Sequence, residues 1–211
     1  MNAQTERLTL VGPVGRIEAL RDAPADDAPP KGVAVIAHPH PLFGGTMDNK
    51  VVQTLARAFV QCGWQAVRFN FRGVGASEGV HDEGRGEAQD FLALVQQCAP
   101  SGPLALAGFS FGSFVMSQTL SALWPARQID KLVLVGAAAS RFQVAQVPPD
   151  LHERTLVIHG EHDDTVPLAA VMDWARPQVL PVTVVPGGSH FFHGQLPLLK
   201  SLVVRHLTSS T

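Results

Sequence analysis

Residues 103–123 read PLALAGFSFGSFVMSQTLSAL, and this stretch decides how the rest of the chain is interpreted. The run 103–109 is apolar, as expected for a strand buried on both faces of a sheet. Residues 111–123 have the length and apolar content of a helix, so Ser110 occupies the turn between them. In the pattern Gly-x-Ser-x-Gly this turn projects the hydroxyl above the sheet, which makes Ser110 a candidate nucleophile. A plain helix N-cap is the alternative interpretation.

Short apolar runs alternate with segments of helical periodicity along most of the chain. Strands are expected at 32–38, 64–71, 103–109, 131–136, 155–160 and 181–187, and helices within 47–63 and at 86–98, 111–123, about 167–176 and about 194–207. Residues 6–20 predict a hairpin around Gly12-Pro13, and 21–32 predict a surface loop. The pattern predicts an α/β fold in a single domain, residues 1–211, with a mostly parallel sheet, helices on both faces and an N-terminal antiparallel hairpin.

The composition is that of an ordinary globular protein. Of 211 residues, 45% are hydrophobic and 16% are charged, and the net charge of −2 gives no indication of nucleic-acid or membrane binding. The first ten residues are polar, and no apolar run approaches the about 20 residues needed to cross a bilayer. Cys62 and Cys98 form no metal-binding or CxxC pair, so reduced thiols and a cytoplasmic location are expected. The sequence indicates no oligomeric state.

Polar residues follow several of the expected strands, at the sheet edge where α/β proteins bind ligands. Asp163 follows the strand 155–160 and His190 follows the strand 181–187. The order serine, acid, histidine is the order found with a strand–helix serine nucleophile. We therefore predict that His190 is the general base for Ser110 and that Asp163 orients His190. Asp164 is the alternative acid and His193 the alternative base, although the spacing favours the first pair.

The loop HPHPLFGG, residues 38–45, is the expected source of a second oxyanion donor beside the backbone N–H of Phe111. Its two prolines have no N–H, so the backbone of His40 is the expected donor, with Leu42 as the second choice. The side chain of His38 is expected to be structural, hydrogen-bonded beneath the loop.

Five motifs in order carry a family resemblance: HPHPLFGGTMDNK (38–50), RFNFRGVGASEG (68–79), GFSFG (108–112), GEHDDTVP (160–167) and GSHFF (188–192). With them the chain resembles the α/β-hydrolase superfamily over about residues 8–207. More narrowly, it is similar to small lidless bacterial hydrolases related to dienelactone hydrolases and S9-peptidase-like esterases. The resemblance implies serine-dependent hydrolysis of a carboxylic ester or related acyl bond. Dienelactone hydrolases use a cysteine nucleophile where this chain has Ser110, so their substrate is not carried over.

Two segments near these motifs are interpreted as structural. The glycines of RGVGASEG permit a tight crossover, and Arg72 is expected to anchor that loop. Glu87 and Asp90 open a helix, where acidic residues suit the helix dipole.

The interval from Ala137 to Arg154, 18 residues, is too short for a multi-helix cap. An open, shallow site that prefers short acyl chains is therefore expected. The candidates for its apolar wall, and thus for substrate binding, are Phe109, Phe111, Phe142, Phe191 and Leu42.

Three other functions fit parts of the sequence. Histidines near strand ends, among them His159 and His162, admit a metallohydrolase, but neither HxHxDH nor HExxH occurs. A catalytically silent binding module could share the fold. A thioesterase or peptidase would use the same three residues. The favoured prediction is a carboxylesterase-like serine hydrolase that acts on a small-molecule ester and needs no metal or organic cofactor.

Overall fold

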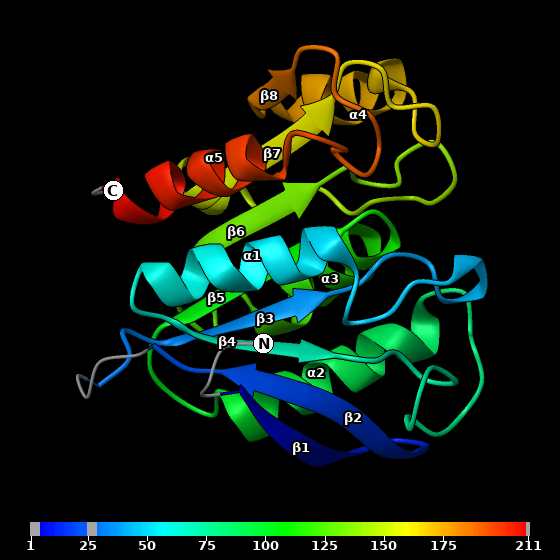
Figure 1. Cartoon of the computed structure of the whole chain (residues 1–211), viewed down its shortest axis with the longest axis vertical. Helices are drawn as coiled ribbons and strands as arrows, with labels where there is room; N and C mark the ends of the chain where they lie inside the picture. Colours follow the sequence, from blue (N-terminus) through cyan, green and yellow to red (C-terminus); the bar gives the residue numbers. More distant parts are fainter. Residues whose placement is uncertain (1–4, 25–28, 210–211) are drawn as a thin grey trace.

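The computed structural model describes residues 5–24 and 29–209, and its centre is an eight-stranded sheet (Figure 1). The strand order is β1-β2-β4-β3-β5-β6-β7-β8. The strands are β1 (Thr5–Gly12), β2 (Gly15–Asp22), β3 (Val33–Ala37), β4 (Gln65–Phe69), β5 (Leu104–Phe109), β6 (Ile129–Val135), β7 (Thr155–Gly160) and β8 (Val182–Val185). The hairpin and β2–β4 are antiparallel and all other pairs are parallel, which confirms the predicted fold class. The loop expected at 21–32 lies partly outside the described residues.

Helices cover both faces of the sheet (Figure 1). On one face, α1 (Lys50–Gln61) packs beside α5 (Leu196–Thr208). On the other face lie α2 (Arg85–Cys98), α3 (Phe111–Leu123) and α4 (Leu168–Ala175). The short 3₁₀ helices are η1 (Pro41–Phe43), η2 (Pro149–Arg154) and η3 (Arg176–Gln178). Each face therefore has its own hydrophobic core, and the central strands between them are buried on both sides.

Strand β3 shows why the apolar runs form central strands. Successive side chains of a strand point to opposite faces, so an uninterrupted apolar run supplies both cores. Ala34 and Ile36 enter the core under α1 and α5, whereas Val35 and Ala37 enter the core under α2 and α3. The same alternation applies to β5, whose six residues are all buried. These two strands end beside each other at the edge where the polar motifs begin.

A buried ion pair fixes the segment that follows β4. Arg72 donates to both carboxylate oxygens of Asp90 on α2, at 2.7 and 2.8 Å. The sequence predicted an anchoring role for Arg72 but assigned Asp90 only to the helix dipole. That assignment is incomplete, because Asp90 lies one turn into the buried face of α2 and neutralises Arg72 there. Glu87 does act at the helix start, where it accepts hydrogen bonds from the N–H groups of Asp82 and Gly84.

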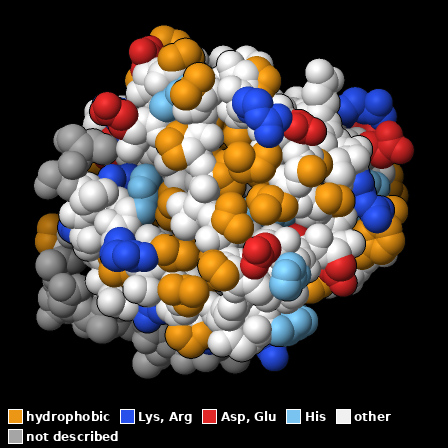
Figure 2. Space-filling view, turned by 90° about the horizontal axis from the view of Figure 1, so that it is seen from above, with side chains coloured by type: hydrophobic (Ala, Val, Ile, Leu, Met, Phe, Trp, Pro, Cys, Tyr) orange, Lys and Arg blue, Asp and Glu red, His pale blue; other side chains and the backbone are white. Residues whose placement is uncertain are grey.

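The surface matches the small net charge. On the face shown in Figure 2, acidic and basic side chains are interspersed, and neither sign forms a continuous patch. In the described part of the chain no helix is both long enough and apolar enough to cross a membrane.

Candidate active site

The carboxyl ends of β5, β7 and β8 bring three sequence-predicted residues into one hydrogen-bonded chain. His190 Nε2 lies 3.0 Å from Ser110 Oγ, and His190 Nδ1 lies 2.7 Å from Asp163 Oδ2. All three side chains belong to buried residues. The contacts join residues 80 and 27 positions apart, so they depend on the parallel order of the strands.

Asp163 is held as a carboxylate. Its Oδ1 accepts hydrogen bonds from the backbone N–H groups of Thr165 at 2.9 Å and Val166 at 2.7 Å. Burial raises the pKa of Asp163, but the hydrogen bonds from His190 and Val166 lower it, and the net shift is downward. An ionised carboxylate only accepts hydrogen bonds, so Nδ1 of His190 donates to it. In a neutral imidazole with this tautomer, Nε2 of His190 accepts a hydrogen bond from the Ser110 hydroxyl.

The turn that carries Ser110 is strained and closely packed. Ser110 has φ +56° and ψ −117°, a conformation that non-glycine residues rarely adopt. A Cβ on Gly108 would lie 2.5 Å from the backbone of Gly112, and a Cβ on Gly112 would lie 2.4 Å from the carbonyl oxygen of Ala37. Both glycines are therefore required for β5, α3 and β3 to approach each other. The backbone N–H of Ser110 donates to Val135 on β6 at 2.8 Å.

The two alternative residues lie outside this hydrogen-bonded chain. Asp164 is exposed, and its carboxylate accepts a hydrogen bond from Thr165 Oγ1 at 3.3 Å. His193 is also exposed, and its ring contacts that of Phe191. Neither has a contact with Ser110 or His190 among the residues that the structure describes.

The loop after β3 presents one unused N–H group near the serine turn. The carbonyl of His40 accepts hydrogen bonds from the N–H groups of Phe43 at 3.1 Å and Gly45 at 3.0 Å, which closes the loop. Among the described residues, the N–H groups of His40 and Phe111 have no hydrogen-bond partner. The N–H of Leu42 donates to Nδ1 of the His40 ring at 3.2 Å. The prediction of Leu42 as the second-choice donor is therefore corrected, because its N–H group already makes this hydrogen bond.

His38 lies beneath this loop and supports it. Its Nδ1 donates to the carbonyl of Pro39 at 2.6 Å, and its Nε2 accepts from the N–H of Phe71 at 3.0 Å. Burial lowers the pKa of His38 to about 4, against a smaller opposing effect of the hydrogen bond to Pro39. The ring is therefore neutral at neutral pH, in the structural position that the sequence predicted.

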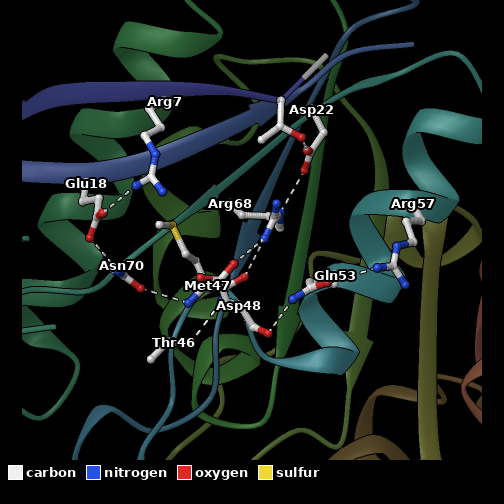
Figure 3. A network of polar contacts seen from close by, with 11 residues as sticks. Arg7, Glu18, Asp22, Thr46, Met47, Asp48, Gln53, Arg57, Arg68 and Asn70 are labelled. Atoms are coloured by element: carbon white, nitrogen blue, oxygen red, sulfur yellow. Dashed lines mark hydrogen bonds and ion pairs between the residues drawn. The ribbon is translucent and has the colours of Figure 1, made fainter. Parts of the chain in front are cut away.

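A polar network holds the far end of the same loop (Figure 3). Met47 donates its N–H to Asn70 Oδ1 at 2.9 Å, and its carbonyl accepts from Arg68 Nη1 at 3.0 Å. Arg68 also donates to Asp22 Oδ2 at 2.9 Å and to Asp48 Oδ1 at 3.2 Å. These contacts fix the chain between the glycines of the loop and the start of α1, so the loop is anchored at both ends.

A cavity of about 330 Å³ opens above Ser110. Its wall is formed by Pro39, His40, Phe43, Gly44, Gly45, Asn49, Ser110, Phe111, Ala138, Arg141, Phe142, Thr165, Val166, His190 and Phe191. Three predicted wall residues, Phe111, Phe142 and Phe191, are among them. The segment between β6 and β7 contains only η2, so no cap covers the opening.

Two predicted wall residues lie elsewhere. Phe109 is fully buried in the core under α1 and α5, where its ring centre lies 4.9 Å from that of His190, so it does not line the cavity. Leu42 is 70% exposed and lies outside the cavity wall. The sequence analysis also missed Asn49, Arg141 and Thr165. Arg141 follows β6, so the strand-end argument that selected Asp163 could have selected it too.

The histidines considered as metal ligands are dispersed. His159 is buried and its Nε2 donates to the carbonyl of Val166 at 2.8 Å, whereas His162 is exposed. Within residues 5–24 and 29–209, no group of three or more His, Cys, Asp or Glu side chains is arranged to hold a metal ion.

Comparison with known proteins gives consistent matches. Residues 28–144 match the model of the family described as serine aminopeptidase, S33. A lidless α/β serine hydrolase from Xanthomonas campestris is 36% identical, with a TM-score of 0.86 over 100% of this chain and 99% of that one. An α/β serine hydrolase homologue from Coxiella burnetii is 37% identical, with a TM-score of 0.81 over 96% of this chain and 97% of that one.

A curated relative also matches part of the chain. An uncharacterized protein of Rickettsia prowazekii is 42% identical over 112 residues, which make up 51% of this chain and 46% of that protein. The match thus spans less than half of that relative's length. From the family model and the two structures that match along almost their whole length, the chain belongs to the serine aminopeptidase S33 family of α/β serine hydrolases.

Proposed function

We propose that this protein hydrolyses small carboxylic esters through an acyl-enzyme on Ser110. The observation that carries the proposal is the hydrogen-bonded chain Ser110–His190–Asp163, with an ionised acid at one end and a strained serine at the other. A serine hydroxyl is a weak nucleophile unless a positioned base removes its proton. In this chain that base is Nε2 of His190.

The proposed reaction has two stages. Ser110 Oγ attacks the ester carbonyl while His190 takes the proton, and Asp163 stabilises the charged imidazole. The N–H groups of Phe111 and His40 bind the oxyanion of the tetrahedral intermediate. His190 then protonates the leaving alcohol, and the acyl group remains on Ser110. In the second stage His190 activates a water that releases the acid and restores the serine.

The cavity favours esters over aminopeptidase substrates. An aminopeptidase binds a free α-ammonium group, for which a carboxylate is the natural partner. Among the described residues that line the cavity there is no Asp or Glu, and the formal charge on the wall is the guanidinium of Arg141. A substrate with a cationic amino group would therefore meet a like charge. Thioesters have no such penalty and are a second substrate class to test with the same assay.

The size of the cavity favours short acyl groups. About 330 Å³ of space, open on one side and lined by phenylalanine rings, accommodates a small acyl chain but offers no tunnel for a long one. We expect p-nitrophenyl esters of C2–C4 acids to be hydrolysed with higher kcat/KM than esters of C12 or longer acids.

The first experiment compares wild type with Ser110→Ala on p-nitrophenyl acetate and butyrate, together with labelling by a fluorophosphonate probe. We expect wild type to turn over and to be labelled, and Ser110→Ala to lose at least about 10³-fold in kcat and all labelling. Ser113→Ala is the matched control, because Ser113 Oγ lies on the same helix but donates to the carbonyl of Gly108. Unlabelled wild type without turnover would contradict the proposal.

A further inference from the structure

Arg141 is an exposed residue in the turn that follows β6, on the wall of the cavity above Ser110. The turn is ordered by hydrogen bonds from the N–H groups of Arg141 and Phe142 to the carbonyl of Ala138, at 3.1 and 3.0 Å. The backbone of Arg141 is thus held in place beside the phenylalanine ring that follows it. Its side chain is part of the cavity wall.

The guanidinium of Arg141 has no hydrogen bond or ion pair with any residue in the described ranges. Every other arginine there except Arg205 uses its side chain in such a contact. Arg68 and Arg72, for example, are tied to Asp22 and Asp90. A guanidinium has five N–H donors in a planar fork. Within those ranges none of the donors of Arg141 is used by the protein, so all of them are available to a ligand in the cavity above Ser110.

The surroundings of Arg141 favour an anionic ligand. The wall contains no carboxylate among its described residues, and four phenylalanine rings make up much of the remainder: Phe43, Phe111, Phe142 and Phe191. The positive charge of Arg141 also acts on the loop 38–45, which follows β3. It contributes to lowering the pKa of His40, after the larger effects of burial and His81, which lower this pKa, and of Glu87, which raises it.

We propose that Arg141 forms a carboxylate subsite, so that the preferred substrates are short esters that carry a second, free carboxylate. Hemiesters of short dicarboxylic acids are the simplest members of this class. A carboxylate matches one guanidinium through two parallel hydrogen bonds. A phosphate can pair with arginine in the same way, so inorganic phosphate is the competing ligand in the binding test below. The reaction remains a hydrolysis, in which one water adds across the acyl–oxygen bond and releases the dicarboxylate and the alcohol. This inference rests on the proposed esterase function and specifies its substrate.

The test uses matched pairs of p-nitrophenyl esters of glutaric, adipic and pimelic acids, with the second carboxyl either free or capped as its methyl ester. At low ionic strength we expect wild type to favour the free acid of the best-fitting pair by about tenfold in kcat/KM, as for a hydrogen bond between charged groups. Arg141→Gln brings the ratio close to one, and Arg141→Lys restores part of it. Arg205→Gln is the matched control and keeps the wild-type ratio. A wild-type ratio of one or below for all three acids, or an unchanged ratio in Arg141→Gln, overturns the subsite.

A binding measurement separates the subsite from the proposed function. Adipate monomethyl ester is titrated calorimetrically into Ser110→Ala and into Ser110→Ala/Arg141→Gln, so no turnover is involved. We expect the second protein to bind at least about fivefold more weakly, since it lacks the charged donor. Equal affinities, undetectable binding to both, or tighter binding of inorganic phosphate than of the monoester each count against the subsite. Arg141-dependent binding in a protein that hydrolyses none of the esters would keep the subsite and reject the esterase function.

Discussion

Two cavities of similar size differ in what their charges do. The larger, about 430 Å³, lies between α1, β2 and β4 and has five ionisable side chains on its wall: Asp22, Asp48, Arg57, Arg68 and Lys200. The smaller, about 330 Å³, lies above Ser110 and has three ionisable side chains on its wall: Arg141, His40 and His190. Asp48 and Asn49 are consecutive residues, yet the first lines the larger cavity and the second lines the smaller one. The start of α1 therefore separates two chemically distinct environments.

The two cavities differ in whether their polar groups are already paired, and this difference indicates which one is the candidate active site. In the larger cavity the buried charges of Arg68 and Asp22 neutralise each other, and Arg68 also contacts the exposed Asp48 and the carbonyl of Met47. In the smaller cavity a base, a hydroxyl and two backbone N–H groups are arranged around open space. Volume alone would favour the larger cavity, whereas the unused N–H donors and the hydrogen-bonded chain Ser110–His190–Asp163 favour the smaller one as the candidate site.

The largest effect is expected from variants that remove the proposed base or acid of the smaller cavity. We expect His190→Ala to lower kcat by at least about 10³-fold, because no other base contacts Ser110 Oγ within residues 5–24 and 29–209, and Asp163→Asn to lower it somewhat less. Steady-state assays with p-nitrophenyl butyrate measure this. His193→Ala and Asp164→Asn are the matched controls and should retain wild-type rates. An equal loss in either control would mean that the assignment of base or acid is wrong.

A smaller effect, on stability, is expected from breaking the Arg68–Asp22 ion pair of the larger cavity. Arg68→Met leaves Asp22 buried without its cation, so we expect the free energy of unfolding to fall by about 3–5 kcal/mol. Urea denaturation measures this loss. The double variant Arg68→Met/Asp22→Asn should recover part of it, because the buried charge is gone.

The exposed Arg57 provides the control in the same cavity. Arg57→Gln should change the free energy of unfolding by no more than about 0.5 kcal/mol. A loss below about 1 kcal/mol in Arg68→Met would show that the pair contributes little and would remove the contrast between the two cavities.

The smallest expected effect is the pH dependence of stability that comes from His38, which supports the loop 38–45. Burial lowers the pKa of His38 from 6.5 to about 4, so between these values the unfolded chain binds a proton that the folded chain does not. Stability contributed by this residue therefore falls as the pH is lowered from about 6.5 to about 4, by up to about 1.4 kcal/mol per pH unit. His206, whose pKa burial also lowers to about 4, acts in the same direction.

The measurement is the free energy of unfolding at pH 7 and pH 5 for wild type and His38→Gln. Glutamine can accept from Phe71 and donate to Pro39 but does not titrate, so the variant should lose less stability on acidification. His162→Gln controls for loss of an exposed imidazole. A pH dependence identical in wild type and His38→Gln would contradict the neutral, supporting role of His38.

The parts of the molecule that the sequence could predict have local signatures. Apolar runs, helical periodicity and the GFSFG turn determine the order of strands and helices, and parallel strands then bring Ser110, Asp163 and His190 to one edge. The Arg68–Asp22 pair has no such signature, because its members are 46 residues apart. The direction of the Phe109 side chain and the engagement of the Leu42 N–H depend on the geometry of a single residue, which an apolar pattern does not encode.

The missing cap has a consequence for the timing of turnover. In hydrolases with lids, opening and closing can set the rate, and closure helps to select the substrate. Only η2 lies between β6 and β7, so substrate and product pass this edge of the sheet without a gate. Selectivity must then come from groups that are already in place before the substrate arrives. The cavity above Ser110 therefore stays connected to bulk water, so water can reach the acyl group of the proposed acyl-enzyme without any movement of a lid.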